Sequence, residues 1–162
     1  MLVAFLAVVI YTDARFTRIP NVITYPTMVV GLIFGVFEGF PGAFFDKGLI
    51  DHFAALVLAF ALCYPFYAFG GLKAGDAKLL MAIGAVRGTW FLLGSALYGA
   101  LLSGIFAIFV IAFRLMRPAP DGGPNSMAKV MKSWMPYGVG LALGGLVALA
   151  LEASGVIGTR PV

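Results

Sequence analysis

Two aspartates stand at the edges of apolar stretches, where a carboxylate is an unusual residue. Asp13 follows the run "MLVAFLAVVIYT", and Asp76 lies in "KAGDAK", shortly before the apolar run that begins at Leu79. A charged side chain at the rim of an apolar helix is costly unless it faces a protein interior or a water-filled cavity. Two carboxylates that converge can share one proton, so that one acts as general base and the other as general acid. Such a pair can activate water against a peptide carbonyl without a metal ion.

Each aspartate also has a purely structural interpretation when it is taken alone. Asp13 could form an ion pair with Arg15 or Arg18. Asp76 could be a first-turn helix residue that is favoured by the helix dipole and paired with a neighbouring lysine. We favour a functional pair because both aspartates are expected at the same depth on one side of the membrane. Gly75 supports this interpretation, since a residue without a Cβ lets an extended substrate backbone approach the adjacent carboxylate.

Other catalytic arrangements find less support in the sequence. His52 is the only histidine and Cys63 the only cysteine. We expect His52 to be a loop or helix-cap residue and Cys63 to be a small packing residue. The chain has no HExxH motif, no CxxC pair and no phosphate-binding loop, so we expect neither a metal site nor a cofactor.

The composition predicts an all-α integral membrane protein. Of the 162 residues, 62% are hydrophobic and 11% are charged, whereas a soluble domain is about half apolar and a quarter charged. The net charge of +4 does not indicate nucleic-acid binding, because the cations fall at the ends of apolar runs. We therefore predict one membrane domain over residues 1–162, with the lipid bilayer as its surroundings.

The apolar runs predict about six transmembrane helices, since crossing a bilayer takes about 20 residues. The stretch from Leu79 to Phe113 is interrupted only by Arg87, and it is too long for one crossing but long enough for two. The glycines of "FGGLKAG" should separate the third helix from the fourth. The expected helices cover roughly residues 1–12, 22–37, 52–72, 75–87, 89–113 and 133–151. The first is long enough to span the bilayer only if the helix continues through Asp13 and beyond.

The distribution of basic residues predicts the orientation of these helices. With six crossings, one side of the membrane receives eight of the eleven basic residues and the other side receives three. The positive-inside rule makes the richer side cytoplasmic, with both termini outside and both aspartates at the cytoplasmic edge. A re-entrant segment at 75–87 would give five crossings and send four cations outward, so we rank it lower. The loop 114–134 should be cytoplasmic, with a short amphipathic helix over "SMAKVMKSW".

Three segments resemble motifs of the type IV prepilin peptidases. "DARFTRIPNVIT" at 13–24 resembles their D-x-R-x-x-x-I-P-N segment, and "GGLKAGDAKLLMAIGA" at 70–85 is similar to their glycine-rich segment ending in G-D-x-K-L. "MPYGVGLALGG" at 135–145 is similar to a late P-Y-x-x-x-x-x-x-G stretch. The matches occur in family order along essentially the whole chain.

The resemblance implies a membrane-embedded aspartic peptidase of the GxGD type. Members of this family cut the basic leader from prepilins and pseudopilins at the cytoplasmic side of the inner membrane. The resemblance makes Asp13 and Asp76 the catalytic pair, which is also the pair indicated by the predicted topology. We further expect Gly75, Lys73 and Asn21 to be candidate substrate-binding residues, and Pro20 with Asn21 to start the second helix, Asn21 as its cap.

The sequence departs from the family pattern in two ways. Lys73 stands at the first glycine of GxGD, where it could influence the Asp76 carboxylate or hold an acidic group of the substrate. We favour its interpretation as a topology anchor. The chain also lacks the CxxC-containing insert of bifunctional members, so we predict the short, peptidase-only type of Flp/Tad pilus systems, without N-methyltransferase activity. The glycines of the last helix are assigned to packing: Gly138, Gly140, Gly144 and Gly145.

Two other functions remain compatible with the same residues. A small transporter or channel subunit could use both aspartates for proton or cation passage, although no acidic relay leads to the opposite face. A non-catalytic assembly factor of a secretion system is the third alternative. The expected partner is a prepilin or pseudopilin substrate, and the sequence leaves the oligomeric state open.

Overall fold

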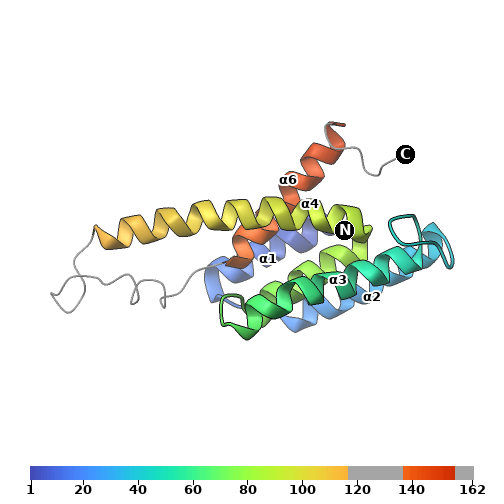
Figure 1. The fold of residues 1–162 in the computed structure, drawn as a ribbon, viewed down its shortest axis with the longest axis horizontal. Coiled ribbons are helices and arrows are strands. Elements are labelled where there is room, and N and C mark those ends of the chain that lie inside the picture. The colour runs from blue at the N-terminus through green and yellow to red at the C-terminus, as the bar shows by residue number, and fades with distance from the viewer. Residues whose placement is uncertain (117–136, 156–162) are drawn as a thin grey trace.

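The computed structural model describes residues 1–116 and 137–155, and these residues form helices joined by short connections (Figure 1). No strand occurs within these two ranges, which confirms the predicted all-α class. The α1 helix extends through Asp13 to Phe16. The helices are α1 (Leu2–Phe16), α2 (Asn21–Glu38), α3 (Leu49–Ala68), α4 (Ala74–Leu115) and α6 (Tyr137–Ala153).

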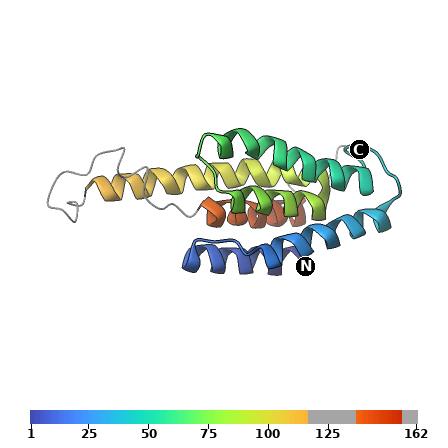
Figure 2. The same ribbon diagram turned by 90° about the horizontal axis from the view of Figure 1, so that it is seen from below.

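The α4 helix is broken at Gly88, where the chain reverses its direction. Gly88 has φ 80° and ψ −178°, outside the helical region. The two halves of α4 run side by side in opposite directions in both ribbon views (Figures 1 and 2). A positive φ favours glycine, and a Cβ here would also collide with the Asp51 carboxylate. The predicted division into helices before and after residue 88 is confirmed.

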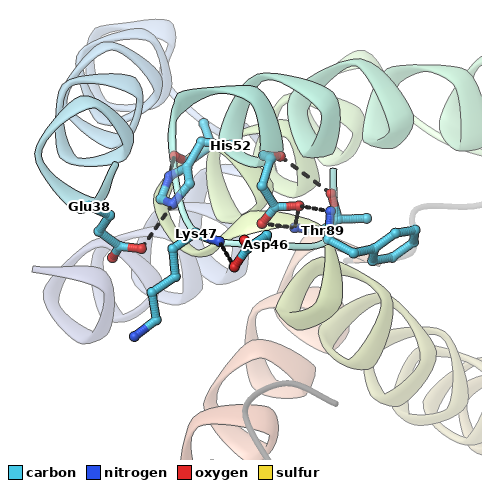
Figure 3. A network of polar contacts seen from close by, with 8 residues as sticks. Glu38, Asp46, Lys47, His52 and Thr89 are labelled. Carbon is cyan, nitrogen blue, oxygen red and sulfur yellow. Dashed lines mark hydrogen bonds and ion pairs between the residues drawn. The ribbon is translucent and has the colours of Figure 1, made fainter. Parts of the chain in front are cut away.

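Asp51 holds this break from the start of α3. Its carboxylate is buried and accepts the backbone N–H of Thr89 at 3.2 Å and that of Phe45 at 3.1 Å. The Thr89 hydroxyl in turn donates to the Asp51 carbonyl at 3.3 Å. The first free N–H group of the second half of α4 is therefore capped by a side chain from another helix (Figure 3).

His52 is not a loop or cap residue, so that prediction is wrong. Its side chain is fully buried on the inner face of α3. Nδ1 lies 2.8 Å from the Ala85 carbonyl oxygen, to which it donates, and Nε2 lies 3.5 Å from a carboxylate oxygen of Glu38 (Figure 3). His52 therefore connects α2, α3 and the first half of α4 at the end of the bundle that contains Gly88.

The glycines of α6 let this helix pack closely against α4 and α1. A Cβ at Gly140 would meet Ser103, and one at Gly144 would meet the backbone of Gly99. Gly145 faces Leu6 of α1, with the nearest side-chain atom 3.1 Å from an added Cβ. The predicted packing role is confirmed for these three glycines. An ion pair between Arg87 and Glu152 joins the break in α4 to the C-terminal end of α6.

The helices have the lengths and surfaces of a membrane protein. Three are long and apolar enough to cross a bilayer: Asn21–Glu38, Leu49–Ala68 and Ala74–Phe113. Large apolar side chains are exposed on the outside of the bundle, including Ile33, Phe60 and Ile108. The six crossings, the sides of the loops and the positions of the termini stay predictions. Apart from residues 114–116, the loop 114–134 and its amphipathic helix lie outside the described residues.

Candidate active site

Asp13 lies on the buried face of α1, near the C-terminal end of this helix. The other buried residues of α1 are apolar and recur at helical spacing: Leu2, Phe5, Leu6 and Val9. Asp13 continues this stripe four residues after Val9 and is 2% exposed. The sequence therefore forms a helix whose inner face ends in a carboxylate, which is favourable only where that carboxylate has polar partners.

Asp76 lies in the first turn of α4 and is also 2% exposed. Its Oδ2 accepts the backbone N–H of Lys73 at 3.2 Å. An acidic residue that reaches back to the residue preceding the helix forms half of a capping box. The interpretation of Asp76 as a helix-start residue is thus confirmed. The proposed ion pairs are not found: within residues 1–116 and 137–155, no lysine or arginine lies at ion-pair distance from either aspartate.

The start of α6 brings the two aspartates to one point. The Val139 N–H donates to Oδ2 of Asp13 at 3.0 Å. A Cβ added to Gly138 would lie 2.7 Å from that same oxygen and 3.0 Å from Oδ1 of Asp76. The separation of the two carboxylate oxygens therefore cannot exceed the sum of these two distances. Residues from the first, fourth and last described helices meet here, although they are far apart in the sequence.

A cavity of about 390 Å³ opens on the two carboxylates. All five residues that the sequence proposed for the site line this cavity, so the structure brings them together. The remaining lining comes from the connection between α1 and α2. The complete lining is Asp13, Thr17, Arg18, Ile19, Pro20, Asn21, Lys73, Gly75 and Asp76.

Gly75 lies at the cavity wall as expected, but Asn21 does not cap α2. An added Cβ at Gly75 would lie 3.4 Å from Ile19, so this side of Asp76 stays open only to small groups. The N-cap of α2 is Pro20, with extended backbone angles, and Asn21 is already the first helical residue. The Asn21 side chain instead accepts a hydrogen bond from Nζ of Lys78 at 2.9 Å. Asn21 thus ties the start of α2 to the start of α4.

Sequence reasoning missed the contribution of α6 to this site. Gly138 was assigned to packing alone, yet it is the residue that both carboxylates contact. The Val139 donor is a backbone group, so its side chain gave no sign of it. The available signal was the position of Gly138 within "MPYG", directly at the start of an apolar helix. Lys78 was also missed as a partner of Asn21.

The arrangement has the parts needed for acid–base chemistry on water. Two buried carboxylates face one point, and each accepts one backbone N–H that fixes its orientation. Like charges this close disfavour full ionisation of both groups, so the pair is suited to sharing one proton. The adjoining cavity gives water and a substrate chain a route to the pair.

A comparison with protein families places most of the chain in a known family. A model of the type IV leader peptidase family matches residues 1–117, which is more than half of the chain. The matched range contains both aspartates and ends before α6. No curated protein and no solved structure matches the chain.

Proposed function

The chain belongs to the type IV leader peptidase family, and on this premise we propose that it is an aspartic endopeptidase that removes the basic leader from prepilins or pseudopilins at the cytoplasmic face of the membrane. One observation carries the proposal. Asp13 and Asp76 are both 2% exposed and line an open cavity, and a Cβ added to Gly138 of α6 would meet both carboxylates.

In the proposed reaction one carboxylate is ionised and the other carries the shared proton. The ionised group accepts a proton from water while the water oxygen attacks the scissile carbonyl carbon. The protonated group donates its proton to the carbonyl oxygen, giving a neutral tetrahedral intermediate. The first carboxylate then gives its proton to the amide nitrogen, and the second takes back the proton of one hydroxyl of the intermediate. The C–N bond breaks and both carboxylates return to their starting states. The N–H groups of Val139 and Lys73 keep both carboxylates oriented throughout.

The substrate is proposed to be a chain with a basic leader followed by an apolar helix. Helical peptide bonds are already hydrogen-bonded, so the scissile region must be extended when it reaches the aspartates. If the chain crosses the membrane six times with both aspartates at the cytoplasmic end, the cavity would lie next to the junction between the leader and the apolar helix of the substrate. Arg18 and Lys73 line this cavity and would repel a basic leader, which should therefore leave the site toward water.

The transporter alternative is not favoured by the family match. Proton or cation passage would also need polar groups along the bundle. Asp51 is the buried carboxylate at the Gly88 end, and two backbone N–H groups already hold it there. A transporter would move ions without cutting a peptide, so the two functions differ in a direct assay.

The proposal is tested with the full chain reconstituted in lipid vesicles with a prepilin. Wild-type protein should remove the leader, whereas Asp13→Asn and Asp76→Asn should each lower the rate by at least about a thousandfold, because the pair acts as one unit. Asp46→Asn is the matched control, since Asp46 is exposed in the connection between α2 and α3. Thermal unfolding of each variant separates loss of chemistry from loss of fold.

Normal cleavage by either site variant would show that the dyad is wrongly assigned. Ion flux without cleavage by the wild type would favour the transporter. We also propose that the enzyme does not methylate the new N-terminus. Incubation of the cleaved product with S-adenosylmethionine should leave its mass unchanged, and a gain of one methyl group would contradict this.

A further inference from the structure

A second cavity, of about 340 Å³, lies beside the carboxylates but is apolar. It opens between α3, the second half of α4 and the start of α6, and we call it the α3–α6 groove. Its wall includes Cys63 and Phe66 of α3, Leu80, Ala100 and Gly104 of α4, and Tyr137 of α6.

The groove lies next to the aspartate pair along α4 and α6. Leu80 follows Asp76 by four residues, so the two side chains leave the same face of α4. Tyr137 directly precedes Gly138, which both carboxylates contact. The α4 and α6 helices therefore extend from the aspartate site into the wall of this groove.

The lining suits a helix with apolar side chains. Phe66 is 64% exposed, and a Cβ added to Gly104 would meet no atom within 4 Å, so the groove is open to the outside of the bundle. Small residues such as Ala100 and Gly104 let another helix approach closely. Among the described lining residues, the Ser103 hydroxyl already donates to the Tyr137 carbonyl at 3.4 Å. Most of the described lining residues have apolar side chains, so the groove offers mainly apolar surface to a helix.

Another apolar groove, of about 300 Å³, lies between α2, α3 and α4, but it faces away from the pair. Ala77 and Met81 of its wall leave α4 on faces other than that of Asp76. Lys78 lies between this groove and the carboxylate cavity. Its Nζ donates a hydrogen bond to Asn21, which lines the cavity, and lies 5.1 Å from the ring centroid of Tyr25, which lines the groove. A chain in this aromatic groove would meet a cation before it met the aspartates.

We propose that the α3–α6 groove binds the apolar helix that follows the scissile bond of the substrate. The proposal rests on the proposed function, because that function supplies an apolar helix whose first residues must reach the aspartates. The groove positions this helix so that its N-terminal end unwinds at Gly138. The helix of the substrate enters sideways from the bilayer, and the leader stays on the water side.

Photo-crosslinking tests where the helix binds. A photoreactive residue is introduced by Phe66→p-benzoylphenylalanine or, as control, Tyr64→p-benzoylphenylalanine, each in the Asp76→Asn chain. Phe66 lines the α3–α6 groove and Tyr64 lines the aromatic groove, while both are exposed aromatic residues of α3. The probe is a synthetic polypeptide with a lysine-rich leader and about 20 apolar residues, in phosphatidylethanolamine and phosphatidylglycerol vesicles.

We expect an adduct with the polypeptide at position 66 that is several-fold stronger than at position 64. The adduct at position 66 should disappear when the apolar segment is deleted. Equal or stronger reaction at position 64, or lipid adducts alone at position 66, would overturn the proposal. Because these chains lack Asp76, the result does not depend on cleavage. If position 66 forms the adduct but the wild-type protein cuts no substrate, the assignment of the groove holds and the peptidase function is refuted.

Kinetics give an independent readout in the catalytically intact chain. Ala100→Phe fills the groove at an exposed position, and Leu97→Phe adds a ring elsewhere on the same helix. Filling the groove should raise KM for the membrane polypeptide about tenfold, because apolar surface of the substrate stays unburied. Cleavage of a short peptide without the apolar segment should be unchanged. An unchanged KM in Ala100→Phe, or an equal rise in Leu97→Phe, would contradict the proposal.

Discussion

Gly138 offers a sharp test of the site, because it has no side chain and yet contacts both aspartates. In Gly138→Ala the new Cβ would lie 2.7 Å from Oδ2 of Asp13 and 3.0 Å from Oδ1 of Asp76. Ordinary contacts of a Cβ are 3.4 Å or longer. The start of α6 or a carboxylate must therefore move by roughly half an ångström or more.

This displacement should reduce both kcat and the free energy of unfolding. Overpacking of this size costs about 1–3 kcal/mol of folding free energy. A shift toward 1 Å between reacting groups can cost about a hundredfold in rate, so we expect kcat to fall by about 10- to 100-fold. KM should change much less, because the groove that we propose for the apolar helix keeps its lining. The weakened hydrogen bond from Val139 to Asp13 adds to the loss, since it orients one carboxylate.

The assay measures leader removal in vesicles as a function of substrate concentration, together with thermal unfolding. Gly94→Ala is the matched control, since an added Cβ at this α4 position meets no atom within 4 Å. It should keep wild-type kcat and gain up to about 1 kcal/mol from helix propensity. A folded Gly138→Ala protein with wild-type kcat would refute the claim that both aspartates act at Gly138.

Two further changes test the supports of the site. Asp51→Ala leaves the buried N–H group of Thr89 and the partly buried N–H group of Phe45 without their acceptor, and should lower the free energy of unfolding by about 1–3 kcal/mol. Unfolding in detergent measures this, and a loss below about 0.5 kcal/mol would contradict it. Lys73→Gly keeps the backbone N–H that Asp76 accepts, and glycine is a good N-cap, so kcat should stay within about threefold of wild type. A loss above tenfold in steady-state cleavage would instead assign a role to the ammonium group.

Local pattern accounts for most of what could be predicted about the helices and the aspartates. Asp13 was recognisable because it stands where an apolar run should continue, and the structure places it on the buried stripe of α1. The break after Arg87 was predictable because an apolar stretch of that length cannot cross a bilayer once. Asp76 was predictable as a helix-start residue since its capping partner, Lys73, is only three positions away.

The predictions that failed depend on geometry that residue type does not define. Asn21 is a good capping residue by type, but Pro20 takes the extended backbone angles of the N-cap. His52 was assigned by its place near a helix start. Its spacing of three residues to Ala55, which continues through Ala59 and Cys63, marks the buried face of α3 and would have predicted burial.

The sequence by itself determined that the protein has apolar helices suited to a membrane and two carboxylates at helix ends. Composition and short-range periodicity encode these features, because they indicate which face of each helix is buried. Only the tertiary structure decided that the start of α6 packs against both aspartates and that an apolar groove lies beside them. These features depend on how the glycine-containing face of α6 packs against α1 and α4, which are distant from it in the sequence. Such complementarity is a property of two packed surfaces, and neither segment carries it alone.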